Sequence, residues 1–295
     1  MKRLLFTGAA TAVVTPMKKD GSLDIKKYKQ LIDWQIKSGI DAIVAVGTTG
    51  ENAVLSADEH RLLMETAVEA ADKRVPVICS TGSNDTEYGR NTSIAAQRAG
   101  ADGLLLVTPY YNKCTQDGII KHYERILSGT DIPAIIYNVP SRTGFQISLE
   151  SCLKLSKIDR IVGIKEASGN LQFAAALASQ CGEDLPIYSG NDDIVLPIIS
   201  IGGKGVISVI SNILPGDMAR LCRASLNGDY QLARELSNRL NTLSRLMFCE
   251  VNPIPIKAAM SELGLCEDWL RLPLTKISPE NRVALKEALL EYGLM

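Results

Sequence analysis

The stretch "IVGIKEASG", residues 161–169, has the composition of a buried β-strand but carries a lysine within it. Ile161, Val162 and Ile164 are β-branched and apolar, which is typical of parallel strands that are covered on both faces. A lysine ammonium in such surroundings loses its hydration, and desolvation disfavours its charged form. Lys165 therefore needs either a charged partner or a chemical role.

Similar short apolar runs alternate with amphipathic segments along the whole chain. Eight strands are predicted, and they recur roughly every 20–35 residues, the scale of a βα unit. The predicted strands are residues 11–16, 42–47, 75–82, 103–111, 133–140, 161–168, 186–192 and 205–211. Eight strands with helices between them predict an α/β fold, the (β/α)8 TIM barrel. A doubly wound open sheet is the alternative.

Helix signals support this alternation. Ser56 followed by Glu59 predicts a capping box at the start of one helix, and Gly39 predicts the C-terminal cap of another. From about residue 215 onward the chain is rich in helix formers and has no strand pattern. We therefore expect a barrel over residues 1–225, carrying the active site, and an appended C-terminal helical region over residues 226–295.

Composition narrows the class of protein. Of 295 residues, 46% are hydrophobic and 22% charged, a globular profile. Lysine plus arginine number 32 and aspartate plus glutamate 33, so no nucleic-acid or membrane partner is expected. Seven dispersed cysteines without a CxxC pair indicate reduced thiols and a cytoplasmic protein. With only two histidines, no protein-held metal is expected.

Polar residues follow several predicted strands. Active sites of barrels lie at the carboxyl ends of the strands and in the loops after them. The residues expected to converge there are Thr48, Thr49, Tyr110, Tyr111, Tyr137, Arg142, Lys165 and Gly190. A desolvated lysine at this rim is suited to Schiff-base formation with a ketone. The alternative is an ion pair with Glu166, although neighbours on a strand face opposite sides.

The other candidates are weaker when each is taken alone. A strand-end tyrosine such as Tyr137 can relay protons, or it can simply pack. Thr48 and Thr49 can offer hydroxyls to a carboxylate, or form an ordinary turn. Arg142 can clamp a carboxylate, or lie in solvent. Cys114 near the rim has no role that the sequence indicates.

Together these motifs resemble a known family. The segments "GTTGE" (47–51), "TPYYNK" (108–113), "YNVPSRTG" (137–144) and "GIKEASGN" (163–170) resemble the dihydrodipicolinate synthases, which are pyruvate-dependent class I aldolases related to N-acetylneuraminate lyase. The resemblance runs nearly end to end, through "GGKGVIS" and "NPIPIK" (252–257). Four motifs in the same order are more specific than any one of them.

The resemblance implies a role for each candidate. Lys165 matches the lysine that captures pyruvate as a Schiff base, and Tyr137 matches the proton-relay tyrosine. Thr48 matches the threonine that links this tyrosine to a second one, Tyr111, which in the family arrives from a neighbouring subunit. The remaining matches are substrate-binding positions: Thr49 for the pyruvate carboxylate, Gly190 and Ile207 for the pyruvate pocket, and Arg142 for the carboxylate of the second substrate.

The resemblance also implies the reaction and the assembly. Pyruvate would condense with L-aspartate 4-semialdehyde to give 4-hydroxy-tetrahydrodipicolinate, the entry step of diaminopimelate and lysine synthesis, without a cofactor. It implies a homo-oligomer, at least a dimer, with a tetramer favoured. Two alternatives stay open: an aldolase that acts on pyruvate and a sugar-acid-like aldehyde, and a catalytically silent barrel that binds a keto acid.

Feedback inhibition by lysine is expected to be weak or absent. In sensitive relatives an inhibitory site lies at the dimer interface, and several of its positions match here. The matches are Asn52, Ala53, His60, Asn84 and Tyr110. Two positions depart from the pattern, because Ala57 replaces a histidine and Tyr88 replaces a glutamate that would bind the ammonium.

Overall fold

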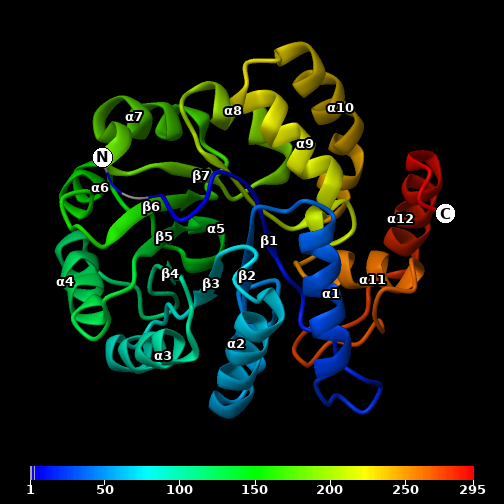
Figure 1. The fold of residues 1–295 in the computed structure, drawn as a ribbon, viewed down its shortest axis with the longest axis horizontal. Helices are drawn as coiled ribbons and strands as arrows, with labels where there is room; N and C mark the ends of the chain where they lie inside the picture. The colour runs from blue at the N-terminus through cyan, green and yellow to red at the C-terminus, as the bar shows by residue number, and fades with distance from the viewer. Residues whose placement is uncertain (1, 3) are drawn as a thin grey trace.

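The computed structural model describes residue 2 and residues 4–295, and its centre is a closed barrel of eight parallel strands (Figure 1). The strands are β1 (Gly8–Ala12), β2 (Ala42–Ala45), β3 (Val77–Ser80), β4 (Gly103–Val107), β5 (Ala134–Asn138), β6 (Ile161–Glu166), β7 (Ile187–Ser189) and β8 (Gly205–Ser208). β1 pairs with both β2 and β8. This pairing closes the barrel, so the predicted (β/α)8 fold is confirmed and the open sheet is excluded.

At least one helix follows every strand and covers the outside of the barrel (Figure 1). These helices are α1 (Ile25–Lys37), α2 (Ala57–Ala71), α3 (Thr86–Ala99), α4 (Gln116–Leu127), α5 (Pro140–Thr143), α6 (Leu149–Leu155), α7 (Leu171–Cys181), α8 (Val195–Ser200) and α9 (Pro215–Leu226). The predicted capping box is present at α2, where Glu59 N donates to Ser56 Oγ and Ser56 N donates to Glu59. Gly39, at a φ of 89°, follows α1 as predicted.

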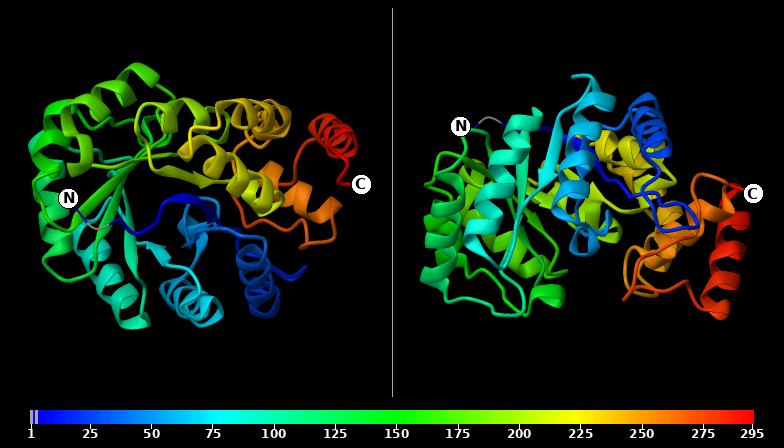
Figure 2. Two further views of the ribbon diagram at one scale, coloured as in Figure 1. Left: turned by 45° about the horizontal axis from the view of Figure 1, so that its top comes forward. Right: turned by 90° about the horizontal axis from the view of Figure 1, so that it is seen from below.

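Three further helices follow the barrel: α10 (Tyr230–Leu246), α11 (Ile254–Glu262) and α12 (Pro279–Tyr292). α10 packs on α9, and α11 packs on α12. The views in Figure 2 place α11 and α12 together at one side of the barrel. In the part of the chain that the structure describes, no helix combines the length and the apolar character needed to cross a membrane.

The first strand differs from its prediction, which was residues 11–16. β1 instead spans Gly8–Ala12, and beyond it Val13 keeps only one backbone bond to β2, from its N–H to the oxygen of Val44. The apolar run after Ala12 remains buried without being a strand, since Val13 and Val14 pack among the residues of the outer core. The predicted strand ends too late because the apolar residues after Ala12 are buried without being in the strand. It starts too late because the strand begins with a glycine, Gly8, which is not typical of strands.

Two apolar layers fill the molecule. The larger one lies between the strands and the helices and includes Ile43, Leu104 and Ile164. The smaller one lines the barrel interior, with members on every strand such as Val44, Leu105 and Ile207. Because side chains alternate between these two layers along a strand, the phase of each strand decides which residues reach the interior.

Strand β6 breaks this alternation once. Ala134 of β5 pairs with Ile161, but Ile135 pairs with Gly163, so β6 carries one extra residue at this point. As a result Val162 lies in the interior layer and Ile164, two residues later, lies in the outer layer. Such a bulge re-aims the residues beyond it. Without it, strict alternation from Val162 would turn Lys165 away from the barrel interior.

Candidate active site

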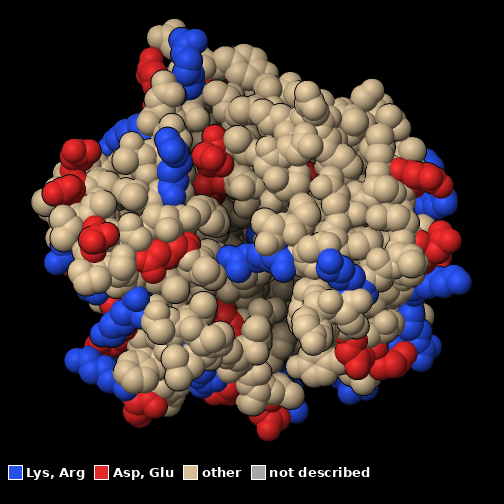
Figure 3. All heavy atoms as spheres, turned by 180° about the vertical axis from the view of Figure 1, so that it is seen from behind, with Lys and Arg blue, Asp and Glu red and all other residues tan. Residues whose placement is uncertain are grey.

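A cavity of about 290 Å³ opens at the carboxyl ends of the barrel strands. Figure 3 shows the face opposite to that of Figure 1, with a hollow near its middle, Lys and Arg side chains at the edge of the hollow and both signs of charge around it. Of the predicted site residues, six line the cavity: Thr48, Thr49, Tyr137, Arg142, Lys165 and Gly190. These six residues lie at the ends of four strands, β2, β5, β6 and β7, and meet in one place, as expected for a barrel.

Lys165 lies in this cavity near the end of β6 and is only 6% exposed. Burial lowers the pKa of its ammonium to about 8 from an ordinary value of 10.5. The carboxyl group of Asp192 acts in the opposite direction, and the Arg142 guanidinium lowers the pKa further. At neutral pH the ammonium is still the major form, but the neutral, nucleophilic amine is far more abundant than in a lysine with the ordinary pKa of 10.5.

The alternative role for Lys165, an ion pair, is not seen. None of the ion pairs among residue 2 and residues 4–295 includes Lys165. The neighbouring carboxylate of Glu166 accepts hydrogen bonds from Asn138 Nδ2 at 2.7 Å and from the Ser168 N–H at 2.6 Å. Since Glu166 is on the outer side of the strand, its charge is directed away from the amine.

Tyr137 lies beside the amine. It is directly opposite Lys165 in the β5–β6 pairing, and Lys165 Nζ lies 4.4 Å from the centre of its ring. Burial raises the pKa of the phenol, while the nearby Arg142 guanidinium and the Thr48 side chain act to lower it. A protonated phenol between an amine and a threonine hydroxyl is placed to exchange protons with a group bound on Lys165.

The C-terminal region contributes to the cavity, which the sequence did not predict. Asn252 Nδ2 donates to Thr49 Oγ1 at 3.0 Å, and Arg142 Nη2 donates to the Asn252 oxygen at 3.2 Å. Phe248 and Val251, both partly exposed, line the cavity from the same loop. The only sequence signal was that Asn252 begins the family-like segment "NPIPIK".

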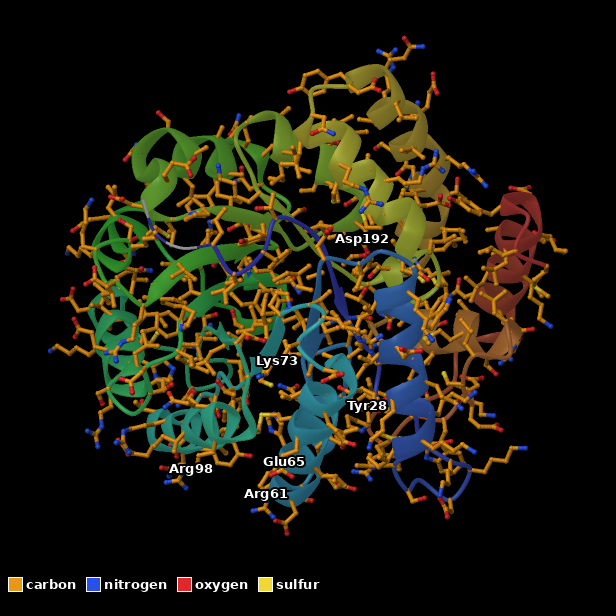
Figure 4. All side chains as sticks on the ribbon, viewed as in Figure 1. Tyr28, Arg61, Glu65, Lys73, Arg98 and Asp192 are labelled. Atoms are coloured by element: carbon orange, nitrogen blue, oxygen red, sulfur yellow. The ribbon has the colours of Figure 1, made fainter. Side chains whose placement is uncertain are left out.

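Asp192 was also missed. Figure 4 shows it inside the ring of helices, in contrast to Arg61 and Arg98, which lie on the outer helices. Its Oδ2 accepts the backbone N–H groups of Val209 and Ile210 at 2.9 and 2.8 Å, which fixes the loop after β7 against the end of β8. Burial raises the pKa of this carboxyl. Its charge nevertheless acts on Lys165, as described above.

Two predicted site residues lie outside the cavity. Ile207 is fully buried in the interior layer of the barrel and is not among the cavity-lining residues. Tyr111 is 93% exposed, with a left-handed φ of 66°, so within one chain its hydroxyl projects into solvent. Three of the positions compared above with the inhibitory site of lysine-sensitive relatives, Ala57, His60 and Tyr88, line a separate hollow of about 210 Å³ between α2 and α3.

Across residue 2 and residues 4–295, no group of three or more His, Cys, Asp or Glu side chains is arranged to hold a metal ion.

Comparison with known proteins agrees with this geometry. A sequence model of the Dihydrodipicolinate synthetase family matches residues 5–292. A 4-hydroxy-tetrahydrodipicolinate synthase of Syntrophobacter fumaroxidans is 48% identical over 292 residues, which are 99% of this chain and 100% of the relative. The crystal structure of dihydrodipicolinate synthase from Aquifex aeolicus superposes with a TM-score of 0.96 at 42% identity, covering 98% of this chain and 99% of that one. The chloride-inhibited enzyme from Acinetobacter baumannii, solved in complex with pyruvate, has the same TM-score, identity and coverage. This chain therefore belongs to the dihydrodipicolinate synthetase family.

Proposed function

We propose that this chain condenses pyruvate with L-aspartate 4-semialdehyde to give 4-hydroxy-tetrahydrodipicolinate, the entry step of diaminopimelate and lysine synthesis. The observation that carries the proposal is Lys165, an amine with a pKa of about 8 in a cavity that Tyr137 and Arg142 also line. Family membership and the pyruvate complex of the Acinetobacter baumannii relative support the choice of pyruvate as the first substrate.

The mechanism starts at Lys165. Its neutral amine attacks the ketone carbon of pyruvate, and loss of water leaves an iminium ion. Loss of a proton from the methyl group converts the iminium into an enamine, whose carbon adds to the aldehyde of the second substrate. The amine of that substrate then displaces Lys165 and closes the ring. The iminium is the electron sink for each step, so the scheme requires no metal and no organic cofactor.

The other cavity residues have supporting roles in this scheme. Tyr137 moves protons at the reacting carbon, with Thr48 as the next hydroxyl in the relay. Thr49 binds the pyruvate carboxylate and Gly190 lines the pocket around it, while Ile207 packs in the interior layer of the barrel. Arg142 binds the carboxylate of the semialdehyde through a charge-assisted contact.

The assembly and location follow as part of the same proposal. The protein is a homo-oligomer, at least a dimer, with a tetramer as the favoured state. In this assembly Tyr111 completes the proton relay of a neighbouring subunit. The exposed ring of Tyr111 at the rim supports this arrangement. Seven cysteines without a disulfide support a cytoplasmic location. Residues 226–295 form a region of their own that completes the cavity through Asn252.

Trapping of the Schiff base tests the proposal. Borohydride in the presence of pyruvate should attach one pyruvate unit to Lys165, because reduction of the imine makes the bond permanent. Mass mapping of peptides should find the adduct within residues 161–169, and Lys165→Ala should abolish it. An adduct on Lys204 or Lys257 would contradict the assignment.

Turnover with the second substrate then separates the remaining alternatives. Condensation with L-aspartate 4-semialdehyde supports the proposal. Turnover with a sugar-acid-like aldehyde in its place identifies the rival aldolase. Trapping of pyruvate without turnover of either aldehyde identifies a silent keto-acid-binding barrel.

A further inference from the structure

A fully buried ion pair lies behind the turn that carries Thr48 and Thr49. Lys257 Nζ is 2.7 Å from Glu51 Oε1, and both side chains are 0% exposed. Lys257 lies on α11, so the pair joins the C-terminal region to the loop after β2. Burying two charges is a weak source of stability, because their desolvation offsets their attraction. The position of the Glu51–Lys257 pair next to the turn indicates a role other than stabilising the fold.

Each member of the pair makes a further hydrogen bond to the backbone. Lys257 Nζ also donates to the Thr15 oxygen at 2.9 Å, and Glu51 Oε2 accepts the Arg271 N–H at 3.2 Å. The segments that contain Thr15 and Arg271 thus converge on the Glu51–Lys257 pair. Charge-assisted hydrogen bonds are shorter and stronger than neutral ones, so they hold the end of the turn in one place.

The turn itself requires such an anchor. Val46 and Glu51, at its two ends, have left-handed φ values of 49° and 58°. This conformation is unfavourable for residues other than glycine, and most of all for a β-branched one such as Val46. It persists where the surroundings impose it. The ion pair supplies that constraint at Glu51.

The same C-terminal segment also contacts the turn at its middle. Asn252 Nδ2 donates to Thr49 Oγ1 at 3.0 Å, and α11 begins two residues after Asn252. Thr49 and Glu51 are thus tied to Asn252 and Lys257, respectively. Movement of α11 relative to the barrel would shift the Thr49 hydroxyl.

We propose that Glu51 and Lys257 are positioning residues that hold the Thr49 hydroxyl in line for the substrate carboxylate. This inference rests on the proposed function, in which Thr49 binds the carboxylate of pyruvate. It assigns to the pair an effect on pyruvate binding that is separate from its effect on folding.

The double variant Glu51→Gln/Lys257→Met tests the inference, because it removes both charges, nearly keeps their volume and leaves no buried charge unpaired. The measurement is the pyruvate concentration that gives half-maximal borohydride trapping, together with the KM of each substrate. We expect the half-maximal concentration and the KM for pyruvate to rise about tenfold, the effect of one misaligned hydrogen bond. The KM for the semialdehyde should stay within about twofold of the wild-type value.

Glu59→Gln is the matched control. Glu59 pairs with Arg271 Nη2 at 2.6 Å at the same junction between barrel and C-terminal region, but it does not contact the turn. This variant should trap pyruvate with the wild-type half-maximal concentration.

Three results would overturn the inference. They are an unchanged half-maximal concentration in the double variant, an equal rise in the control, and a double variant that does not fold. Failure of the wild-type protein to trap pyruvate refutes the proposed function instead, so the two failures are distinguishable.

Discussion

The proposed chemistry depends first on the environment of one side chain, that of Lys165. Lys165 has an ordinary amine, but burial in a cavity lined by Tyr137, Leu105 and Val139 makes its charged form less favourable. Asp192 limits the effect, because its carboxyl group favours the ammonium. These opposing influences leave the pKa at about 8, where the lysine can be both nucleophile and proton acceptor.

The pKa of Lys165 predicts a pH profile for pyruvate capture. The depressed pKa of about 8 means that the neutral amine increases as the pH rises through that value. The rate of trapping with cyanoborohydride, measured from neutral to alkaline pH, should therefore rise and level off with a midpoint near 8. In Arg142→Ala the midpoint should move upward, because a cation that lowers the pKa is removed. A wild-type midpoint near the ordinary 10.5 would contradict the burial argument.

Arg142 gives a prediction about the second substrate. In Arg142→Ala the extent of pyruvate trapping should equal that of the wild-type protein, while kcat/KM for the semialdehyde should fall. The loss of a charge-assisted contact costs about 1.5–3 kcal/mol, or roughly 10- to 150-fold in rate. Steady-state kinetics and mass analysis of the trapped protein measure the two effects. Equal losses in both assays would mean that Arg142 only supports the fold.

Individual elements bring these side chains together. The bulge in β6 turns Lys165 into the barrel, and the register of β5 sets Tyr137 directly opposite it. The loop after β7 packs so closely on β6 that a Cβ on Gly190 would overlap the Cβ of Ala167 and lie 3.1 Å from the Glu166 oxygen. Glycine at this position therefore allows the two strand ends to approach each other.

Gly190→Ala should consequently lower both stability and pyruvate capture. Overpacking of a buried site costs about 1–3 kcal/mol, and here the displaced Ala167 is a cavity-lining residue. Thermal unfolding and borohydride trapping are the measurements. Gly216→Ala is the control. Gly216 lies in α9, and a Cβ there would be 3.5 Å from the nearest atom, the Ser38 oxygen, which is an ordinary contact distance. Similar losses in both variants would argue against the packing explanation.

At the scale of the whole molecule, one chain leaves the proposed relay incomplete. Thr48 and Tyr137 lie in the cavity, but the hydroxyl of Tyr111 is outside it, on a ring that is 93% exposed at the rim. An exposed aromatic ring of this size favours an interface. The proposed relay therefore takes its second tyrosine from a partner subunit.

A mixing experiment tests this sharing of sites. Tyr111→Phe and Lys165→Ala should each be inactive, but after subunit exchange a mixed dimer contains one site with both an intact lysine and an intact tyrosine. Part of the wild-type activity should return, measured by condensation after exchange is verified by native mass spectrometry. Exchange without recovered activity would show that Tyr111 acts within its own chain or not at all.

Local patterns in the sequence determined the repeated strand–helix units, the capping box at α2 and the presence of a lysine in an apolar strand. These features depend on residues that are neighbours along the chain, so they could be predicted from it, and the family motifs added the expected site. The inward direction of Lys165 was decided by a bulge in its pairing with β5. The contacts of Asn252 with Thr49 and of Lys257 with Glu51 join residues 203 and 206 positions apart. Only closure of the barrel and docking of α11 bring such distant residues together, and no local pattern encodes that contact.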